Sequence, residues 1–461
     1  MQYRKVLLAI GLSLGNFMTA MSASIVTVAI PSIMQYFHAS ILTAGWIAMA
    51  PLVTITGLII PVGKLADMVG RKRIYLLGGL VFLVGSLLCG TSHSMAFLIA
   101  ASVLQAVGAA AIFACTPAIL SISFPPGQIG KALGLIGLGV SLGGLLGPAA
   151  GGYIIQYAGW RFVYLAGVPV WVINFLLVRW ILSDDTPEIR DLSFDISGAV
   201  SFFLFTLFFI LALNKGADLG LSSPAVLVMG LISALSMLFF IRREIRTANP
   251  MVNLRIFRNT MLTISIISRV LFFMLLYIFN FTIPFYLQQV LHYPPSKMGL
   301  ILSPVPLIRL VSGPLGGWIS DSIGTRWLTT IGMLMSGLMA ALLTTMGNSA
   351  SSADILLRFI LFGLGMGIFT VPNMSALLGS VDRQDVSFAS SSIGLFRTMG
   401  MALGIAAANV VINLSLPGAK SSPHAVNEEV LLAALENSWW LAAALGFMGA
   451  AVSLMKESKK Q

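Results

Sequence analysis

Charged residues are scarce in this chain of 461 residues, because only 9% are Asp, Glu, Lys or Arg, while 57% are hydrophobic. The mean hydropathy is +0.94. A soluble globule cannot bury so large an apolar fraction, so we expect an all-α integral membrane protein. The net charge of +11 then reflects basic residues on cytoplasmic loops, and we expect no nucleic-acid partner.

Cysteine is also rare. The two cysteines, Cys89 and Cys115, both lie in apolar runs and indicate neither a disulfide framework nor a metal site. No nucleophile with a nearby base, metal-ligand cluster or phosphate-binding loop is visible in the sequence. We therefore expect no enzymatic activity, no cofactor and no metal.

Carboxylates are missing from the middle of the apolar runs. On our assignment all 16 Asp and Glu residues fall in loops or at helix ends. We therefore expect no carboxylate at bilayer depth that could neutralise a cationic drug or carry a proton.

What the chain does contain is a series of long apolar runs. Each is long enough to cross a hydrocarbon core of roughly 30 Å. We predict fourteen transmembrane helices at 6–32, 42–62, 74–92, 96–120, 132–156, 161–182, 196–213, 224–241, 260–289, 297–319, 327–346, 354–380, 387–415 and 436–455. An even number of helices places both termini on one side of the membrane. Most Lys and Arg residues fall on that side, so we expect cytoplasmic termini in a multi-pass protein of the cell (inner or plasma) membrane.

A tight cluster of glycine and charge separates the second and third runs. It reads Gly63-Lys-Leu-Ala-Asp67-Met-Val-Gly70-Arg71-Lys-Arg73. Glycine allows a sharp turn and close helix approach, and Asp67 can pair with Arg71 or Arg73. We interpret the segment as a short cytoplasmic turn.

A weaker copy of this turn follows the tenth run. Gly317, Asp321, Gly324 and Arg326 repeat the spacing of the first copy. Two copies of one loop indicate two related six-helix halves, with the seventh and eighth helices inserted between them. The expected domains are an N-terminal bundle, a linker with the inserted pair, and a C-terminal bundle with the tail, at 1–182, 183–259 and 260–461.

The first copy is similar to the loop signature of the major facilitator superfamily. In the fifth helix, Gly147-Pro148 followed by Gly151-Gly152 resembles the antiporter motif of drug-exporting members. The chain therefore resembles the fourteen-helix drug:proton antiporters (multidrug efflux proteins), which implies a major facilitator fold with helices arranged 6+2+6. The resemblance also implies export by alternating access. Gating residues implied by these motifs are Gly63, Asp67, Gly70, Arg71, Asp321, Arg326, Gly147 and Pro148.

Two positions depart from the pattern of those antiporters. Ser22 stands where the first helix usually carries an aspartate, and Ser102 stands where the fourth helix usually carries an arginine, three residues ahead of Gln105. Loss of both is physically coherent, because removing one member of a buried ion pair leaves the other uncompensated. The usual route of proton coupling is in question, and protons stay a candidate coupling ion. His292 is the one histidine that we retain as an alternative carrier.

Three arginines lie deep in apolar runs, namely Arg269, Arg309 and Arg397. An arginine at the bilayer centre costs roughly 2.5–3.5 kcal/mol on insertion scales, so it should face a cavity or a partner. We expect them to line an electropositive cavity, although Arg397 equally suits a structural or gating role and Arg309 could pack against neighbours. The other candidate substrate-binding residues are Gln105, Asn280, Gln289, Ser22 and Ser102.

These patterns predict a secondary active transporter, a monomer in the lipid bilayer, that exports a small organic or amphipathic solute of anionic character. One alternative is proton-coupled efflux of lipophilic cations. Another is a non-transporting membrane receptor on the same fold.

Overall fold

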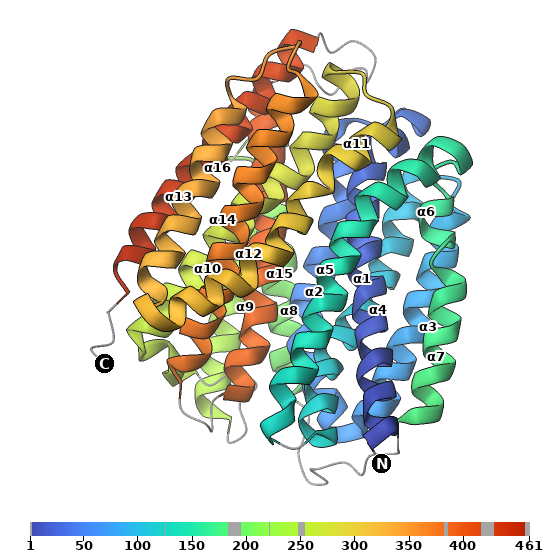
Figure 1. The fold of residues 1–461 in the computed structure, drawn as a ribbon, viewed down its shortest axis with the longest axis vertical. Coiled ribbons are helices and arrows are strands. Elements are labelled where there is room, and N and C mark those ends of the chain that lie inside the picture. The colour runs from blue at the N-terminus through green and yellow to red at the C-terminus, as the bar shows by residue number, and fades with distance from the viewer. Residues whose placement is uncertain are drawn as a thin grey trace.

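The computed structural model describes residues 2–124, 126–182, 195–220, 222–247, 254–381, 386–415 and 428–456. Within these ranges every regular element is a helix, and fourteen helical segments are long and apolar enough to span a membrane. The helices run side by side; the N mark lies at the bottom of the view and the C mark at its left side, in the lower half (Figure 1). The predicted all-α membrane fold is confirmed.

The first six predicted spans correspond to seven helices, because the sixth span is divided near its start. These helices are α1 (Gln2–Tyr36), α2 (Ile41–Val69), α3 (Arg71–Gly90), α4 (Met95–Ser123), α5 (Pro126–Ala158), α6 (Phe162–Leu165) and α7 (Val168–Ile181). The inserted pair comprises α8 (Ile196–Leu219) and α9 (Pro224–Arg246).

The last six spans begin after a short 3₁₀ helix, η1 (Leu254–Arg258). Proline and a π-turn divide two of them. The elements are α10 (Thr260–Phe285), the π-helix η2 (Tyr286–Val290), α11 (Pro295–Leu302), α12 (Pro304–Ile323), α13 (Thr325–Leu343), α14 (Ser352–Gly379), α15 (Val386–Ser415) and α16 (Glu428–Leu454).

The inserted pair packs where α2 and α15 meet. Ile59 of α2, Phe202 of α8, Phe240 of α9 and Leu395 of α15 form one buried apolar cluster. Helix α8 contacts both α2 and α15 along this line, and α9 packs on α8. The pair therefore covers one of the two seams between the N-terminal and C-terminal helices.

Helix α5 packs closely on α1 through glycines spaced four residues apart. A Cβ atom added to Gly147 would collide with the Ser24 hydroxyl of α1, and one on Gly139 would collide with Ser13. Ser24 Oγ also donates a hydrogen bond to the Gly143 carbonyl at 3.1 Å. Such small residues let two backbones approach closely inside a membrane.

The opposite face of α5 contacts α11 of the other half. A Cβ atom on Gly152 would collide with the Pro295 carbonyl, and one on Gly299 would collide with the Pro148 carbonyl. Helix α11 lies at the end opposite the termini (Figure 1). The two halves are thus in backbone contact at that end, which we call the outer end.

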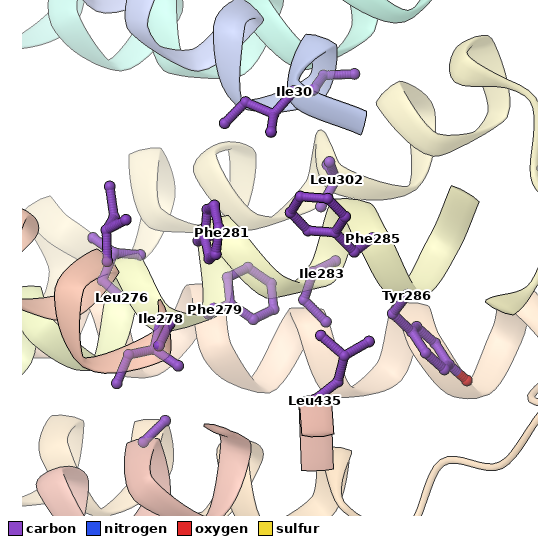
Figure 2. Close-up of a cluster of buried hydrophobic side chains, with 14 of the residues drawn as sticks. Ile30, Leu276, Ile278, Phe279, Phe281, Ile283, Phe285, Tyr286, Leu302 and Leu435 are labelled. Carbon is purple, nitrogen blue, oxygen red and sulfur yellow. The ribbon is translucent and has the colours of Figure 1, made fainter. Parts of the chain in front are cut away.

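An apolar cluster adds to the closure of the outer end. Figure 2 shows Phe281 and Phe285 of α10 directed toward Ile30 of α1, with Leu302 of α11 beside them. All four side chains are buried. Nearby, Gln288 donates a hydrogen bond across the halves to the hydroxyl of Ser32 in α1 at 3.2 Å.

Both repeated loops are single-residue turns rather than the longer turns expected. Helix α2 continues to Val69 and α3 begins at Arg71, so the predicted turn at 63–73 is too long and Gly63 lies inside a helix. Gly70 has φ +111° and Gly324 has φ +87°, both in the region that favours glycine. The repeat of the sequence is therefore a repeat of the backbone.

Candidate functional site

Three arginines enter the middle of the C-terminal helices from three different elements. Arg269 lies nine residues into α10 and Arg397 eleven residues into α15. At roughly 1.5 Å per residue these positions are about 14–17 Å from the ends of their helices. Arg309 lies in α12, fourteen residues after the start of α11. Their depth agrees with the depth predicted from the sequence.

The three guanidinium groups lie within electrostatic range of one another. Arg397 is near enough to both Arg269 and Arg309 for mutual electrostatic repulsion, and Arg309 also acts on Arg269. The hydroxyl of Tyr277 lies within electrostatic range of Arg309 and Arg397. We call these four residues the arginine cluster.

Aromatic rings and one backbone carbonyl support the cluster. Arg269 Nε donates a hydrogen bond to the Ile393 carbonyl of α15 at 3.2 Å, and its guanidinium lies 5.2 Å from the ring centroid of Phe273. The Arg397 guanidinium lies 5.4 Å from the ring centroid of Phe113 in α4. Cation–π contacts of this kind hold a guanidinium in place without neutralising its charge.

Most of the guanidinium donors have no acceptor. Arg269 Nη1 and Arg397 Nε are buried without a hydrogen-bond partner. Arg309 makes no hydrogen bond or ion pair with any described residue. Because each guanidinium offers five N–H donors in a planar fork, the cluster presents many unused donors to an oxygen-rich ligand.

No carboxylate among the described residues pairs with the cluster. One expectation about the acids is wrong, however, because α16 begins at Glu428 and Glu436 lies two turns inside this helix rather than at its start. Its neighbour Asn437 donates a hydrogen bond to Ser415 at the end of α15. Glu436 therefore lies level with the outer end of α15, far from the arginines along that helix.

The N-terminal half contains a neutral polar group at the departures from the antiporter pattern. Gln105 Nε2 donates hydrogen bonds to the hydroxyls of Ser86, at 2.8 Å, and Ser22, at 3.4 Å. Ser102 donates to the Ile99 carbonyl of its own helix at 2.7 Å and is buried. Hydroxyls and an amide thus form a hydrogen-bonded network in which no member carries a charge.

The comparisons with known proteins decide the family. The Major Facilitator Superfamily profile matches residues 12–405. The chain belongs to the Major Facilitator Superfamily. This major facilitator is 29% identical to the riboflavin transporter RibZ of Clostridioides difficile over 97% of this chain and 96% of that protein. It is 30% identical to the multidrug resistance protein Stp of Mycobacterium tuberculosis (strain CDC 1551 / Oshkosh), over 92% of this chain and 79% of Stp.

Solved structures of major facilitators share the fold. A bacterial homologue of the lysosomal transporter Spinster, crystallised in an inward-facing conformation, aligns with a TM-score of 0.68 at 15% identity over 100% of both chains. A transporter of the POT family in complex with a thioalcohol-conjugated peptide aligns with a TM-score of 0.74 at 14% identity, covering 96% of this chain and 94% of that chain. The predicted resemblance to drug transporters of the superfamily is confirmed.

The gating residues predicted for this major facilitator differ between its two copies. In the first copy, Arg71 pairs with Asp67 across the Gly70 turn, with an N–O distance of 2.8 Å. In the second copy, no ion pair joins Asp321 to Arg326. Arg326 instead lies 5.5 Å from the ring centroid of Trp327, and its Nε is buried without a partner. The two copies therefore share a glycine turn but not an ion pair.

Other predicted substrate-binding residues lie outside the cluster. Asn280 and Gln289 are half-buried, and no hydrogen bond of either side chain occurs among the described residues. It is Gln288 that bonds across the halves. His292 pairs with Glu428 at an exposed site on the outer side, 3.0 Å apart, so it lies in a loop as expected.

Two members of the site were not selected from the sequence. Tyr277 and Phe113 are not among the substrate-binding residues predicted from the sequence. The spacing of Arg269, Phe273 and Tyr277, each four residues after the last, places all three on one face of α10, and this signal could have identified Tyr277. Nothing in the sequence of α4 indicates that Phe113 meets an arginine of α15.

Proposed function

We propose that this major facilitator is a secondary active transporter that exports a small organic or amphipathic anion by alternating access. The observation that carries the proposal is the arginine cluster. Its three buried or half-buried arginines have unused donors and, within the described residues, no carboxylate partner. A ligand with carboxylate, sulfonate or phosphate oxygens would supply both the missing acceptors and the missing negative charge.

The neutral network in the other half supports an anion over a cation. A nearby acid would favour a lipophilic cation, whereas Ser22 and Ser102 are neutral and stand where the antiporter pattern that this chain resembles carries charges. Gln105 and the serines can hydrogen-bond a polar substrate without selecting its charge.

A second candidate substrate comes from the relatives. The name of RibZ says riboflavin, and the chain matches that protein over almost its full length. Aromatic rings at Phe113 and Phe273 next to arginines would suit a flat heteroaromatic ring. The name of the multidrug resistance protein Stp favours export of more than one kind of compound.

Closure at the outer end supports an inward-facing arrangement with cytoplasmic termini. In this proposal the bundles 1–182 and 260–461 rock about the central site, and the inserted pair within 183–259 follows them. The Gly70 and Gly324 turns lie on the side of the termini, where the pathway would be open.

Transport into proteoliposomes tests the proposal with two matched flavins. Riboflavin is neutral and riboflavin 5′-phosphate is the same molecule with an anionic group, so their competition isolates the effect of charge. We expect the phosphate to be transported and to bind at least tenfold more tightly, a difference of about 1.4 kcal/mol. Dissociation constants from intrinsic flavin fluorescence would complement the fluxes.

Substitutions test whether the preference for the phosphate arises in the arginine cluster. Arg269→Gln and Arg309→Gln should weaken binding of riboflavin 5′-phosphate much more than Arg179→Gln, which changes an exposed arginine in the last turn of α7. Unchanged transport of the phosphate by both cluster variants would reject the anion site. Transport of riboflavin alone would favour the substrate of the relative, and transport of a lipophilic cation alone would favour multidrug efflux.

A further inference from the structure

The charge of the arginine cluster constrains more than the choice of substrate. Alternating access requires an occluded intermediate in which the pathway is closed at both ends. In that intermediate, water is displaced from Arg269, Arg309 and Arg397 unless something else solvates them. Burying a charged group without a partner carries a large desolvation penalty.

The protein itself provides little compensation. Among the described residues, only Arg269 of the three arginines has a hydrogen bond from its guanidinium, to the Ile393 carbonyl. Phe273 and Phe113 contribute cation–π contacts to Arg269 and Arg397. Neither a carbonyl nor a ring removes the mutual repulsion among three like charges.

The other half cannot supply the charge either. Among the described residues, the network of Gln105, Ser22 and Ser86 is neutral, and Glu436 lies at the outer end. No carboxylate in the part of the chain that the structure describes pairs with the arginines, so none of those acids can adjust the charge of the site by taking up or losing a proton.

We infer that this protein is an obligatory exchanger. Its binding site opens rapidly to the opposite side of the membrane only when an anion with two or more negative charges is bound to the arginine cluster. The inference rests on the proposed anion transport and adds that transport in one direction requires transport of an anion in the other. A bound dianion lowers the charge of the occluded site, whereas the empty site must be dehydrated with its full positive charge. Net export would then require another anion to enter in return.

The test compares exchange with net uptake. Purified full-length protein is reconstituted into two sets of liposomes. One set contains unlabelled riboflavin 5′-phosphate at about 5 mM, a concentration expected to saturate the site. The other contains the same buffer with chloride in its place. Uptake of labelled riboflavin 5′-phosphate is then measured from outside, with and without an imposed pH gradient. We expect uptake at least tenfold faster into the loaded vesicles, with no response to the pH gradient.

Removing one positive charge should weaken the requirement for a bound anion. Arg309→Gln should lower the ratio of exchange to net uptake, because the empty site is then less strongly charged, even though affinity also falls. A purely structural loss would reduce both fluxes together. Arg179→Gln, the exposed control, should retain the ratio of the unmodified protein.

Each outcome decides a separate statement. Equal uptake into loaded and empty vesicles would overturn obligatory exchange while leaving anion transport intact. Uptake driven by the pH gradient into empty vesicles would overturn it in favour of proton coupling. No uptake of the phosphate under any condition would reject the proposed anion transport, and obligatory exchange would be rejected with it.

Discussion

The guanidinium of Arg397 in α15 lies over the ring of Phe113 in α4, 5.4 Å from its centroid. This contact joins the two halves near the middle of the helices. The hydrogen bonds from Gln288 to Ser32 and from the Ser296 amide to Gln156, and the close backbone contacts, lie at the outer end. A charged residue of the candidate site therefore also belongs to the interface that must change during transport.

Replacing Phe113 with Leu should weaken the present arrangement. Loss of a cation–π contact worth roughly 0.5–2 kcal/mol would raise the population with an open outer end by about 2- to 30-fold. Electron paramagnetic resonance can measure this change as the distance between two spin labels. The labels are placed at the exposed outer positions Tyr157 and Leu414. Phe97→Leu, on an exposed face of α4, is the control, and an unchanged distance distribution in the Phe113 variant would contradict the expectation.

Adding one methyl group between α5 and α11 should separate the halves. In Gly152→Ala and Gly299→Ala, the new Cβ atom meets a carbonyl of the opposite helix. Overpacking of this kind costs typically 1–3 kcal/mol, so the outer end should open roughly 5- to 150-fold more often. Labelling of a cysteine placed at Ser32 by a membrane-impermeant maleimide should then accelerate.

The same helix offers a matched control for that experiment. Nothing lies within 4 Å of a Cβ atom added to Gly137. Gly137→Ala should leave the labelling rate at Ser32 unchanged. Equal acceleration by this variant would show that the change acts through the stability of α5 rather than through its contact with α11.

The two single-residue turns should resist substitution by alanine. Gly70→Ala and Gly324→Ala place a Cβ atom in a left-handed conformation, at a cost of roughly 1–2 kcal/mol each. Thermal unfolding in detergent should show lower midpoints for both variants. Gly230→Ala, in the middle of α9 with open space around it, should instead be neutral or stabilising, and similar losses in all three variants would contradict the argument.

A buried lysine after α16 should make stability depend on pH. Lys456 donates a hydrogen bond to Thr329 at 3.3 Å, and burial lowers the pKa of its ammonium group to about 7. In the unfolded chain the group keeps its proton until about pH 10.4. Between these values the unfolded state binds more protons, so the free energy of unfolding should rise with pH, by at most about 1.4 kcal/mol per pH unit.

Comparison of unfolding midpoints at pH 7 and pH 9 measures this dependence. The midpoint of the unmodified protein should be higher at pH 9, and Lys456→Met should remove most of the difference. Lys64→Met, at a partly exposed position of α2, should retain it. If the midpoint of the Lys456→Met variant rises between pH 7 and pH 9 as much as that of the unmodified protein, the pH dependence arises from other groups.

The number and order of the membrane helices could be predicted because hydrocarbon thickness fixes the length of each apolar run. The ends of the helices could not. Helix α2 continues to Val69 and α16 begins at Glu428, both beyond the apolar residues. A helix satisfies its own backbone hydrogen bonds wherever it lies, so a change in side-chain polarity does not end it.

The depth of the arginines followed directly from their positions along the helices, but their neighbours did not. Contacts depend on how each helix is rotated about its axis, and the sequence gives no direct measure of that rotation. At the end of α10, the π-helix η2 changes the rotation, and Gln288 rather than Gln289 meets the other half. The meeting of Arg397 with Phe113 likewise depends on packing between two halves that are far apart in the chain.

The glycine face of α5 has a consequence for how this gene can vary. Every single-base change at a glycine codon that alters the residue adds a side chain, and along the α1 contact there is no space for one. A complete map of tolerated substitutions should therefore show intolerance at every fourth position of this face. It should show tolerance where the helix meets open space. The intolerant positions are Gly139, Gly143 and Gly147, with a milder effect at Gly151, where the nearest atoms of Ile25 are 3.2–3.5 Å away. The tolerant positions are Gly134, Gly137 and Gly144.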